Sequence, residues 1–284
     1  MTRDTIFEEQ ASVLSHEALD GDQYILRLHA PECAAKAEAG QFIHLSTHPM
    51  QPLRRPISIM RASPEQGWID LLYKVVGKGT GYLSERKVGE TISMLGPIGV
   101  PFKNTCKKPL LIGGGVGMPP MIFLAEALKD LKDIKPFVIL GSEVPFPFTP
   151  KPSQILSPGL PDGVIAAMPL LDDWGILSRL ASLQGYPGCL DGYVTDLARY
   201  WLDSLNKDEL EEVEIFSCGP HPMLEAVVKL AREYEIPVQT SLEEFMACAV
   251  GGCAGCVVEV QTPDGPAMKR VCVDGPVFDG YTVF

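Results

Sequence analysis

The sequence predicts a multidomain β + α/β protein with an antiparallel β-barrel, a doubly wound parallel sheet and a small C-terminal domain. Residues 7–100 hold short alternating segments separated by glycine and proline, as in small barrels. From Pro109 onward, short apolar segments alternate with longer helical ones, which indicates a parallel sheet. Four closely spaced cysteines then organise the C-terminal segment. The expected domains are residues 1–104, 105–238 and 239–284.

The first domain is expected to be built from six strands rich in β-branched and aromatic residues. A short helix is expected over Gly79–Arg86, with Thr80 as its cap. The expected strands are Phe7–Leu14, Tyr24–Leu28, Phe42–Ser46, Ile57–Arg61, Trp68–Val75 and Thr91–Leu95.

The second domain is expected to begin with a buried strand over Leu110–Ile112 and a glycine-rich turn. A helix over Pro119–Leu131 should follow, because Pro119 and Pro120 fit only the first turn of a helix. The proline-rich segment Pro145–Pro161 is expected to be irregular. The other expected strands are Phe137–Leu140, Val164–Ala167 and Glu214–Ser217, and the other expected helices are Trp174–Leu183, Asp196–Leu205 (capped by Thr195) and Pro222–Glu233.

Charge and composition narrow the classes of partner. The net charge of −12 argues against a nucleic-acid partner and against an anionic membrane surface. Charged residues follow Met1, and no apolar signal segment begins the chain, so a cytoplasmic location is expected. In that reducing compartment the eight cysteines are not expected to form disulfides.

The most specific motif is the cysteine spacing C-x4-C-x2-C-x15-C, formed by Cys248, Cys253, Cys256 and Cys272. Four thiolates can hold two sulfide-bridged irons, and the x4/x2 spacing is typical of a plant-type 2Fe–2S loop. The residues between the first three cysteines are mostly glycine and alanine, which lets the loop wrap closely around a cluster. Structural zinc in a nucleotide-binding module is the alternative, although all-cysteine zinc sites usually pair two C-x2-C units.

Two glycine-containing turns in the second domain are candidate cofactor sites. Gly113–Pro120 joins a strand to a helix, where free backbone N–H groups and the helix dipole favour a phosphate. Cys218-Gly219-Pro220 ends a later strand, and ligands gather beyond the carboxyl ends of parallel strands. The alternatives are a tight turn without a ligand and a merely buried cysteine, and His221 is expected to begin a helix.

Two segments of the first domain also suit a phosphate. Arg54-Arg55-Pro56-Ile57-Ser58 offers guanidinium groups for a pyrophosphate and a hydroxyl for a flavin ring nitrogen. Lys74–Thr80 offers glycines and a helix N-terminus. Surface ion pairs and hairpin glycines are the alternatives.

The order of these motifs resembles the ferredoxin–NADP reductase superfamily. The motifs are Arg-Pro-Ile-Ser, Gly-Lys-Gly-Thr, Leu-Gly-Pro-Ile-Gly, Gly-Gly-Gly-Val-Gly-Met-Pro-Pro and Cys-Gly-Pro. The cysteine segment and the tail Asp274-Gly275-Pro276-Val277-Phe278 narrow the resemblance to the electron-transfer subunits of dihydroorotate dehydrogenase B.

That resemblance implies FAD in the barrel, a nicotinamide cofactor in the second domain and a 2Fe–2S cluster on the four cysteines. An aromatic residue usual in the superfamily is absent here, with Ile57 in its place. The implied site residues are Arg55, Pro56, Ile57, Ser58, Leu72, Tyr73, Lys74, Gly79 and Thr80 for FAD, and Gly114, Gly115, Gly117 and Cys218 for the nicotinamide cofactor.

The resemblance further implies a subunit that connects a partner FMN dehydrogenase, which oxidises dihydroorotate in pyrimidine biosynthesis, with NAD. The assembly is expected to be a hetero-tetramer. Glu143 favours NADH, because a carboxylate accepts from a ribose 2′-hydroxyl and repels a 2′-phosphate. The alternatives are a reductase subunit of a transhydrogenase, hydrogenase or oxygenase, and a free-standing NADH oxidase. Hydride transfer needs no general base, so no catalytic residue is assigned.

Overall fold

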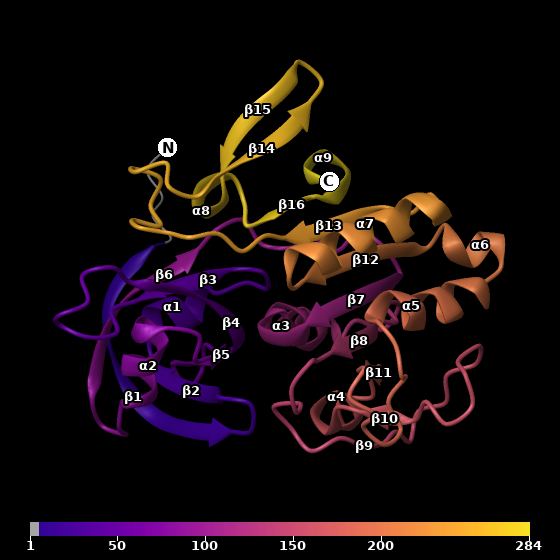
Figure 1. The fold of residues 1–284 in the computed structure, drawn as a ribbon, viewed down its shortest axis with the longest axis horizontal. Helices are drawn as coiled ribbons and strands as arrows, with labels where there is room; N and C mark the ends of the chain where they lie inside the picture. The colour runs from indigo at the N-terminus through magenta and orange to yellow at the C-terminus, as the bar shows by residue number, and fades with distance from the viewer. Residues whose placement is uncertain (1–5) are drawn as a thin grey trace. The chain divides into compact units, whose positions relative to one another are not determined.

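The computed structural model describes residues 6–284, which divide into two compact units (Figure 1). The first unit contains the described residues up to Phe102 together with Leu242–Val277, and the second contains Lys103–Ser241 with Phe278–Phe284. The cysteine-bearing segment therefore groups with the barrel, and the C-terminus groups with the α/β unit. The division into three domains at 104/105 and 238/239 stays a prediction.

The first unit is built on a closed barrel with the strand order β1-β2-β5-β4-β3-β6, in which all neighbours are antiparallel. This confirms the barrel that the alternating segments predict. The barrel closes because each strand turns one apolar row inward. Its strands are β1 (Phe7–Leu19), β2 (Gln23–His29), β3 (Phe42–Leu45), β4 (Arg55–Ser63), β5 (Trp68–Lys74) and β6 (Thr91–Ile98).

Cross-strand pairs fill the barrel interior. Leu26 faces Leu71 and Leu28 faces Ile69, and all four side chains are completely buried. Two short helices, α1 (Pro31–Lys36) and α2 (Lys78–Ser84), lie between strands. The same unit holds the hairpin of β14 (Val257–Thr262) and β15 (Gly265–Arg270), followed by α8 (Val271–Asp274).

The second unit is built on a six-stranded sheet with the order β11-β8-β7-β12-β13-β16. The first five strands pair in parallel, which confirms the predicted α/β architecture. The strands are β7 (Lys108–Gly114), β8 (Phe137–Gly141), β11 (Leu177–Ala181), β12 (Val213–Cys218), β13 (Val238–Ser241) and β16 (Val277–Asp279), with the small pair β9 (Lys151–Pro152) and β10 (Ala166–Ala167) beside them. The helices are η1 (Gly115–Gly117), α3 (Met118–Leu128), α4 (Pro169–Asp173), α5 (Val194–Asp203), α6 (Lys207–Leu210), α7 (His221–Tyr234) and α9 (Gly280–Val283).

Helices cover both faces of this sheet. On one face, α5 and α7 bury apolar residues at helical spacing, such as Leu197 and Trp201, against Ile112 and Ile139. On the other face α3 packs closely, since a Cβ at Gly113 would stand 3.1 Å from Met121. Pro119 and Pro120 lie in the first turn of α3, as predicted. None of the helices in residues 6–284 combines the length and apolar composition that a membrane crossing requires.

The predicted helix over Trp174–Leu183 is wrong. Gly175 has a φ of +72° and ends α4, and the chain then continues as strand β11. Leucine, serine and alanine there carry no decisive strand propensity, but pairing with β8 and burial of Ser178 and Arg179 override the local preference. The predicted cap of α5 is also misplaced, because Tyr193 occupies the N-cap and its N–H donates to Asp196.

Candidate flavin, nicotinamide and iron–sulfur sites

The two glycine-containing turns of the α/β unit lie against each other. Strands β7 and β12 are parallel neighbours in which Gly113 faces Cys218, so both carboxyl ends reach the same edge of the sheet. A Cβ at Gly117 would stand 2.2 Å from the carbonyl oxygen of Cys218. Only glycine therefore allows the start of α3 to approach the end of β12. Gly115 has a φ of +54° and no neighbour within 4 Å of a Cβ position, which leaves its backbone open to a ligand.

Met223 is a residue of this edge that the sequence analysis did not identify. A Cβ placed on Gly114 would stand 2.4 Å from Sδ of Met223, and a Cβ placed on Gly219 would stand 2.5 Å from its Cε. The thioether therefore fills the gap between the two turns, and the pattern Cys-Gly-Pro-x-Pro-Met was the available signal. Cys218 itself is completely buried, so it borders this edge through its backbone.

Glu143, the predicted ribose contact, follows β8, and the neighbouring strand β11 ends beside it. Ser182 donates its hydroxyl to the carbonyl oxygen of Ser142 at 2.7 Å, which joins the ends of the two strands. Glu143 comes next in the chain and is exposed. Residues 142–146 and 182–186 contain no Lys or Arg that could bind a 2′-phosphate.

One buried guanidinium, that of Arg179, contacts the proline-rich segment and its neighbours. Arg179 donates to the carbonyl oxygens of Val164 at 3.1 Å, Ile155 at 2.8 Å and Ser178 at 2.7 Å. Burial lowers its pKa, while the Asp172 carboxylate acts in the opposite direction. Most of the segment is irregular, as predicted, but Lys151–Pro152 forms a short strand with Ala166–Ala167, and the Ile155 carbonyl oxygen is bound by Arg179.

In the barrel, Arg55 and Gly79 form a cradle. The guanidinium of Arg55 donates to the carbonyl oxygens of Leu53 at 2.8 Å and Arg54 at 3.1 Å. A Cβ at Gly79 would stand only 2.3 Å from Arg55 Nε. The missing side chain at Gly79 therefore lets the guanidinium lie on the first turn of α2. A positive group beside free helix N–H groups suits a pyrophosphate.

Arg54, the residue before Arg55, makes different contacts. Its guanidinium donates to the Ser93 carbonyl oxygen and to the Ser93 hydroxyl, each at 2.8 Å, and so joins β6. Thr80 likewise uses its hydroxyl within the protein, accepting from Val76 N–H at 3.0 Å. It supports α2 from the third helical position, behind an N-cap at Gly77.

The other predicted flavin residues lie in the barrel wall. Leu72 and Tyr73 are buried, and the Tyr73 hydroxyl lies 2.8 Å from Nε2 of His16. Burial, together with nearby Tyr24, raises the pKa of Tyr73. Ile57 is buried, whereas Ser58 and Lys74 are half-buried, so the last two can present side-chain polar groups. Pro56, opposite His44 in β3, is also half-buried.

The four cysteines of the predicted cluster motif lie together as two pairs. The sulfurs of Cys256 and Cys272 are 3.3 Å apart, and the Cys253 thiol hydrogen-bonds Cys248. Thiolates on one tetrahedral metal, with bonds of about 2.3 Å, stand about 3.8 Å apart. Among residues 6–284, no three His, Cys, Asp or Glu side chains converge on a single metal position. The two sulfur pairs match in number the two irons of the predicted cluster.

Backbone N–H groups of the cysteine loop point toward the cysteine sulfurs. Ala249 and Gly251 have φ values of +56° and +85°, and a Cβ at Gly251 would stand 2.5 Å from Val273. Burial alone would raise the pKa of Cys248, but hydrogen bonds from the backbone of Val250 and from the Cys253 thiol lower it to about 7. Backbone N–H groups therefore stabilise a thiolate here, as an anionic cluster requires.

The net shift is opposite in the second pair, where burial is not outweighed by hydrogen bonds. Burial and the neighbouring Cys256 thiol raise the pKa of Cys272 to about 12. This thiol keeps its proton until a metal displaces it.

The tail motif fixes the cysteine segment to the barrel. The Val100 N–H donates to the Gly275 carbonyl oxygen at 2.7 Å, and a Cβ at Gly99 would stand 2.3 Å from Pro276 Cδ. Leu242 N–H donates to the Pro276 carbonyl oxygen at 2.9 Å. The motifs Leu-Gly-Pro-Ile-Gly and Asp-Gly-Pro-Val-Phe thus pack on each other, a tertiary relationship that neither shows by itself.

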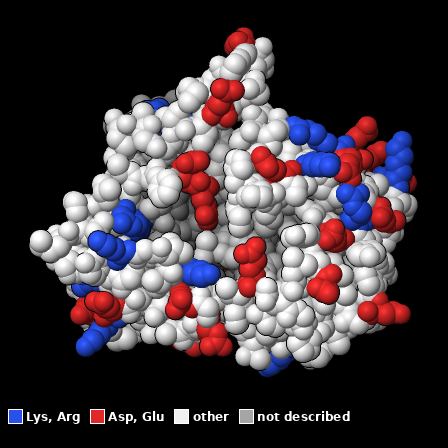
Figure 2. Space-filling model, viewed as in Figure 1, with Lys and Arg blue, Asp and Glu red and all other residues white. Residues whose placement is uncertain are grey.

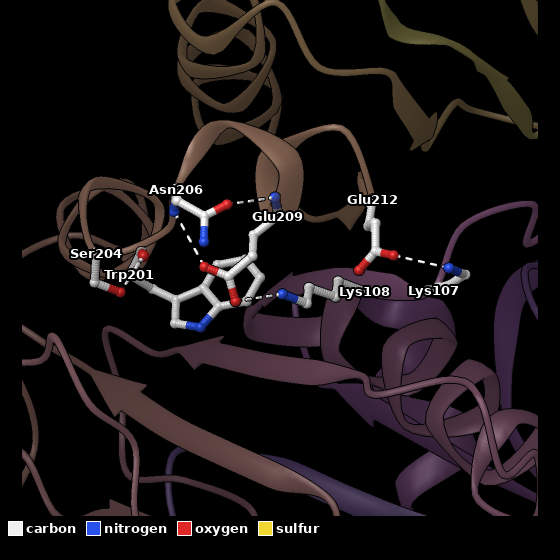
Figure 3. A network of polar contacts seen from close by, with 7 residues as sticks. All are labelled: Lys107, Lys108, Trp201, Ser204, Asn206, Glu209 and Glu212. Atoms are coloured by element: carbon white, nitrogen blue, oxygen red, sulfur yellow. Dashed lines mark hydrogen bonds and ion pairs between the residues drawn. The ribbon is translucent and has the colours of Figure 1, made fainter.

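Charged residues elsewhere form ion pairs that stabilise the fold. At the amino end of β7, opposite the glycine-rich turn, Lys108 pairs with Glu209 at 2.7 Å and Lys107 with Glu212 at 2.8 Å, beside the capping box of Asn206 (Figure 3). On the face of the molecule that Figure 2 shows, basic side chains are scattered among acidic ones without a continuous basic patch.

Known proteins resemble this chain over nearly its whole length. Residues 243–284 match the iron–sulfur cluster binding domain of dihydroorotate dehydrogenase B, and residues 10–102 match the oxidoreductase FAD-binding domain. The electron transfer subunit of dihydroorotate dehydrogenase B (NAD(+)) from Desulforamulus reducens is 32% identical, covering 96% of this chain and 97% of the relative. Its counterpart from a Geobacillus species is 33% identical, covering 95% and 96%.

Solved structures share the fold. The NADH-dependent reduced ferredoxin-NADP oxidoreductase has a TM-score of 0.78 and 27% identity, covering 97% of this chain and 90% of that chain. The ferredoxin reductase of carbazole 1,9a-dioxygenase, with 22% identity, a TM-score of 0.64 and coverage of 83% and 69%, shows the fold alone. From its identity to the curated relatives and the two matched domains, the chain belongs to the family of electron transfer subunits of dihydroorotate dehydrogenase B.

Proposed function

We propose that this chain carries electrons between a partner dehydrogenase, which oxidises dihydroorotate, and NAD, and that it holds FAD and a 2Fe–2S cluster. The observation that carries the proposal is the pairing of the four motif cysteines in a chain whose barrel seats Arg55 on Gly79. Relatives named as electron transfer subunits over more than nine-tenths of the chain support the same assignment.

FAD exchanges electrons both in pairs and singly, which allows a nicotinamide and an iron–sulfur cluster to be connected. In this chain, Arg55 and the first turn of α2 would bind the FAD pyrophosphate. Ser58 and Lys74 would orient the flavin through side-chain polar groups, and Leu72 and Tyr73 through their backbone. Pro56 and Ile57 would supply apolar contact, and Thr80 would hold the α2 turn in place.

The cysteine pairs would each bind one iron, Cys248 with Cys253 and Cys256 with Cys272. Loop N–H groups that lower the pKa of Cys248 would also stabilise the charge of the cluster. The glycines and left-handed alanine allow the loop to enclose it without intervening side chains.

The nicotinamide cofactor would lie at the edge formed by Gly114, Gly115, Gly117 and Cys218. Open backbone at Gly115 would approach the pyrophosphate, and Met223 would support the turn from below. Glu143, and the lack of Lys and Arg in residues 142–146 and 182–186, favour NAD(H) over NADP(H).

The proposed assembly is a cytoplasmic hetero-tetramer with an FMN-containing catalytic subunit. The test is to purify the chain with its partner, analyse flavin and iron, and assay NAD reduction with dihydroorotate. The proposal predicts FAD on this chain, FMN on the partner and dihydroorotate-dependent NADH formation. A partner without dihydroorotate oxidation, or a colourless zinc protein, would contradict it.

A second function has support from one observation. The NADH-dependent reduced ferredoxin-NADP oxidoreductase is similar over 97% of this chain. A reductase subunit of that kind would co-purify with a different flavoprotein and reduce NADP with ferredoxin, and the same purification separates the two proposals.

A further inference from the structure

His44 is a buried polar side chain that neither the flavin site nor the cysteine site accounts for. It lies in β3 opposite Pro56 of β4, and its exposed surface is 0%. Neither ring nitrogen has a hydrogen-bond partner at bonding distance among the described residues. A neutral imidazole carries one donor and one acceptor, and leaving a buried donor unpaired costs about 1–3 kcal/mol. Such a cost calls for an explanation.

The backbone around the ring supplies one. The imidazole faces backbone groups of Arg54 and Met246, and both raise its pKa, as carbonyl oxygens near a ring N–H do. Arg54 directly precedes Arg55 of the flavin cradle, and Met246 lies two residues before Cys248. The ring thus stands between the segment expected to hold flavin and the segment that leads into the cysteine loop, within one compact unit.

The charge state of the ring is set by its surroundings. Burial is the largest cause that lowers the pKa of His44, and the positive charges of Arg54 and Arg55 lower it further. The two backbone groups raise the pKa, but the net value is about 4. The ring is therefore neutral near pH 7 and has one N–H to donate.

We propose that His44 is a positioning residue for electron transfer, whose ring N–H donates to the Met246 backbone carbonyl in the loaded protein and holds the cysteine loop against the flavin-binding strand. The inference rests on the proposed function. It concerns placement alone, since His44 exchanges neither electrons nor protons with a substrate. Losing the donor should leave both cofactor sites formed but misplace one relative to the other.

The test compares His44→Gln with His44→Met, side chains of similar length of which only Gln retains an N–H donor. Stopped-flow spectroscopy of the holoprotein with NADH gives the rate of flavin reduction and the rate of cluster reduction. For His44→Met, the ratio of the cluster rate to the flavin rate should fall about tenfold. His44→Gln should restore most of it, and His29→Met, an exposed histidine of β2, should leave it unchanged.

A second readout does not depend on activity. Phe245 is 93% exposed and adjoins Met246, so chymotrypsin cleavage after Phe245 reports whether the segment is held. Cleavage should be faster in His44→Met than in wild type and His44→Gln. If His44→Met does not fold, His44→Leu, which also lacks an N–H donor, takes its place with the same expectations.

An unchanged rate ratio and unchanged cleavage in the donor-free variant would overturn the inference. Failure of the proposed function looks different: the wild-type protein itself would then lack flavin or cluster, or would not reduce its cluster with NADH.

Discussion

The guanidinium of Arg55 lies where a side chain at Gly79 would stand, 2.3 Å from the Cβ position to Nε. Residues far apart in the sequence are thereby brought together at the start of α2, where we propose that the FAD pyrophosphate binds. Arg54 donates hydrogen bonds to Ser93 instead, so the two adjacent arginines have separate roles that mutation can test.

Arg55→Ala is expected to weaken FAD binding by roughly 30-fold, since a charge-assisted hydrogen bond contributes about 2 kcal/mol. Arg54→Ala is the matched control: it should lower the free energy of unfolding by about 1 kcal/mol and affect FAD affinity far less. Isothermal titration of the apoprotein with FAD measures both. Equal losses of affinity would remove the distinction between the two arginines.

Gly79→Ala is expected to displace the Arg55 guanidinium and to weaken FAD binding about tenfold. Gly81 lies in the same helix and has no neighbour within 4 Å of a Cβ position, so Gly81→Ala should leave FAD binding intact. It should also stabilise α2 by up to about 1 kcal/mol. FAD retention on gel filtration and thermal unfolding report the two effects, and similar FAD loss in both variants would refute the cradle.

Cys253→Ser is expected to abolish the cluster while leaving FAD bound and NADH-to-dye activity largely intact, because the barrel core does not depend on this exposed residue. Iron content and the visible spectrum measure the result. Cys189→Ser, at a half-buried cysteine in the other unit, should keep its iron. Loss of flavin from Cys253→Ser would show that the barrel and the cysteine segment fold as one cooperative unit.

Arg179→Leu is expected to cost about 3 kcal/mol of unfolding free energy, because two buried backbone carbonyls and one partly buried one lose their donor. Lys107→Gln, which breaks an exposed pair in Figure 3, should cost under about 1 kcal/mol. Urea unfolding distinguishes them. A small effect of Arg179→Leu would mean that the proline-rich segment is held by other contacts.

Stability should fall in acid partly through His44. Its folded pKa of about 4 lies below the ordinary value of 6.5, so the unfolded chain binds the extra proton first as pH falls. The stabilisation is complete above pH 6.5 and is lost between 6.5 and 4, on the order of 3 kcal/mol in total. His44→Gln should flatten this part of the profile in urea unfolding. Parallel profiles would show that His44 does not titrate as described.

Local patterns predicted most of the fold. Alternation defined the barrel strands, and apolar segments with glycine turns defined β7, β8 and β12. Helix Trp174–Leu183 failed because its residues carry weak preferences, and the strand exists through pairing with β8 and the anchoring of Arg179. Such long-range contacts leave no signal at sequence spacing.

The sites likewise combine features that are local in the sequence with features that depend on long-range contacts. The cysteine spacing is local, and the structure brings those sulfurs together. Met223 and His44 were missed because their neighbours, Gly114 and Met246, are distant in the sequence. The seating of Arg55 on Gly79 was equally invisible, although each motif was recognised separately.

Electron paramagnetic resonance of the purified protein, with FAD and iron quantified on the same sample, tests the central claim most directly. The account predicts about two irons per FAD and, after reduction with NADH, the signal of a one-electron-reduced 2Fe–2S cluster. Zinc in place of iron, or a cluster that NADH leaves oxidised, would contradict it.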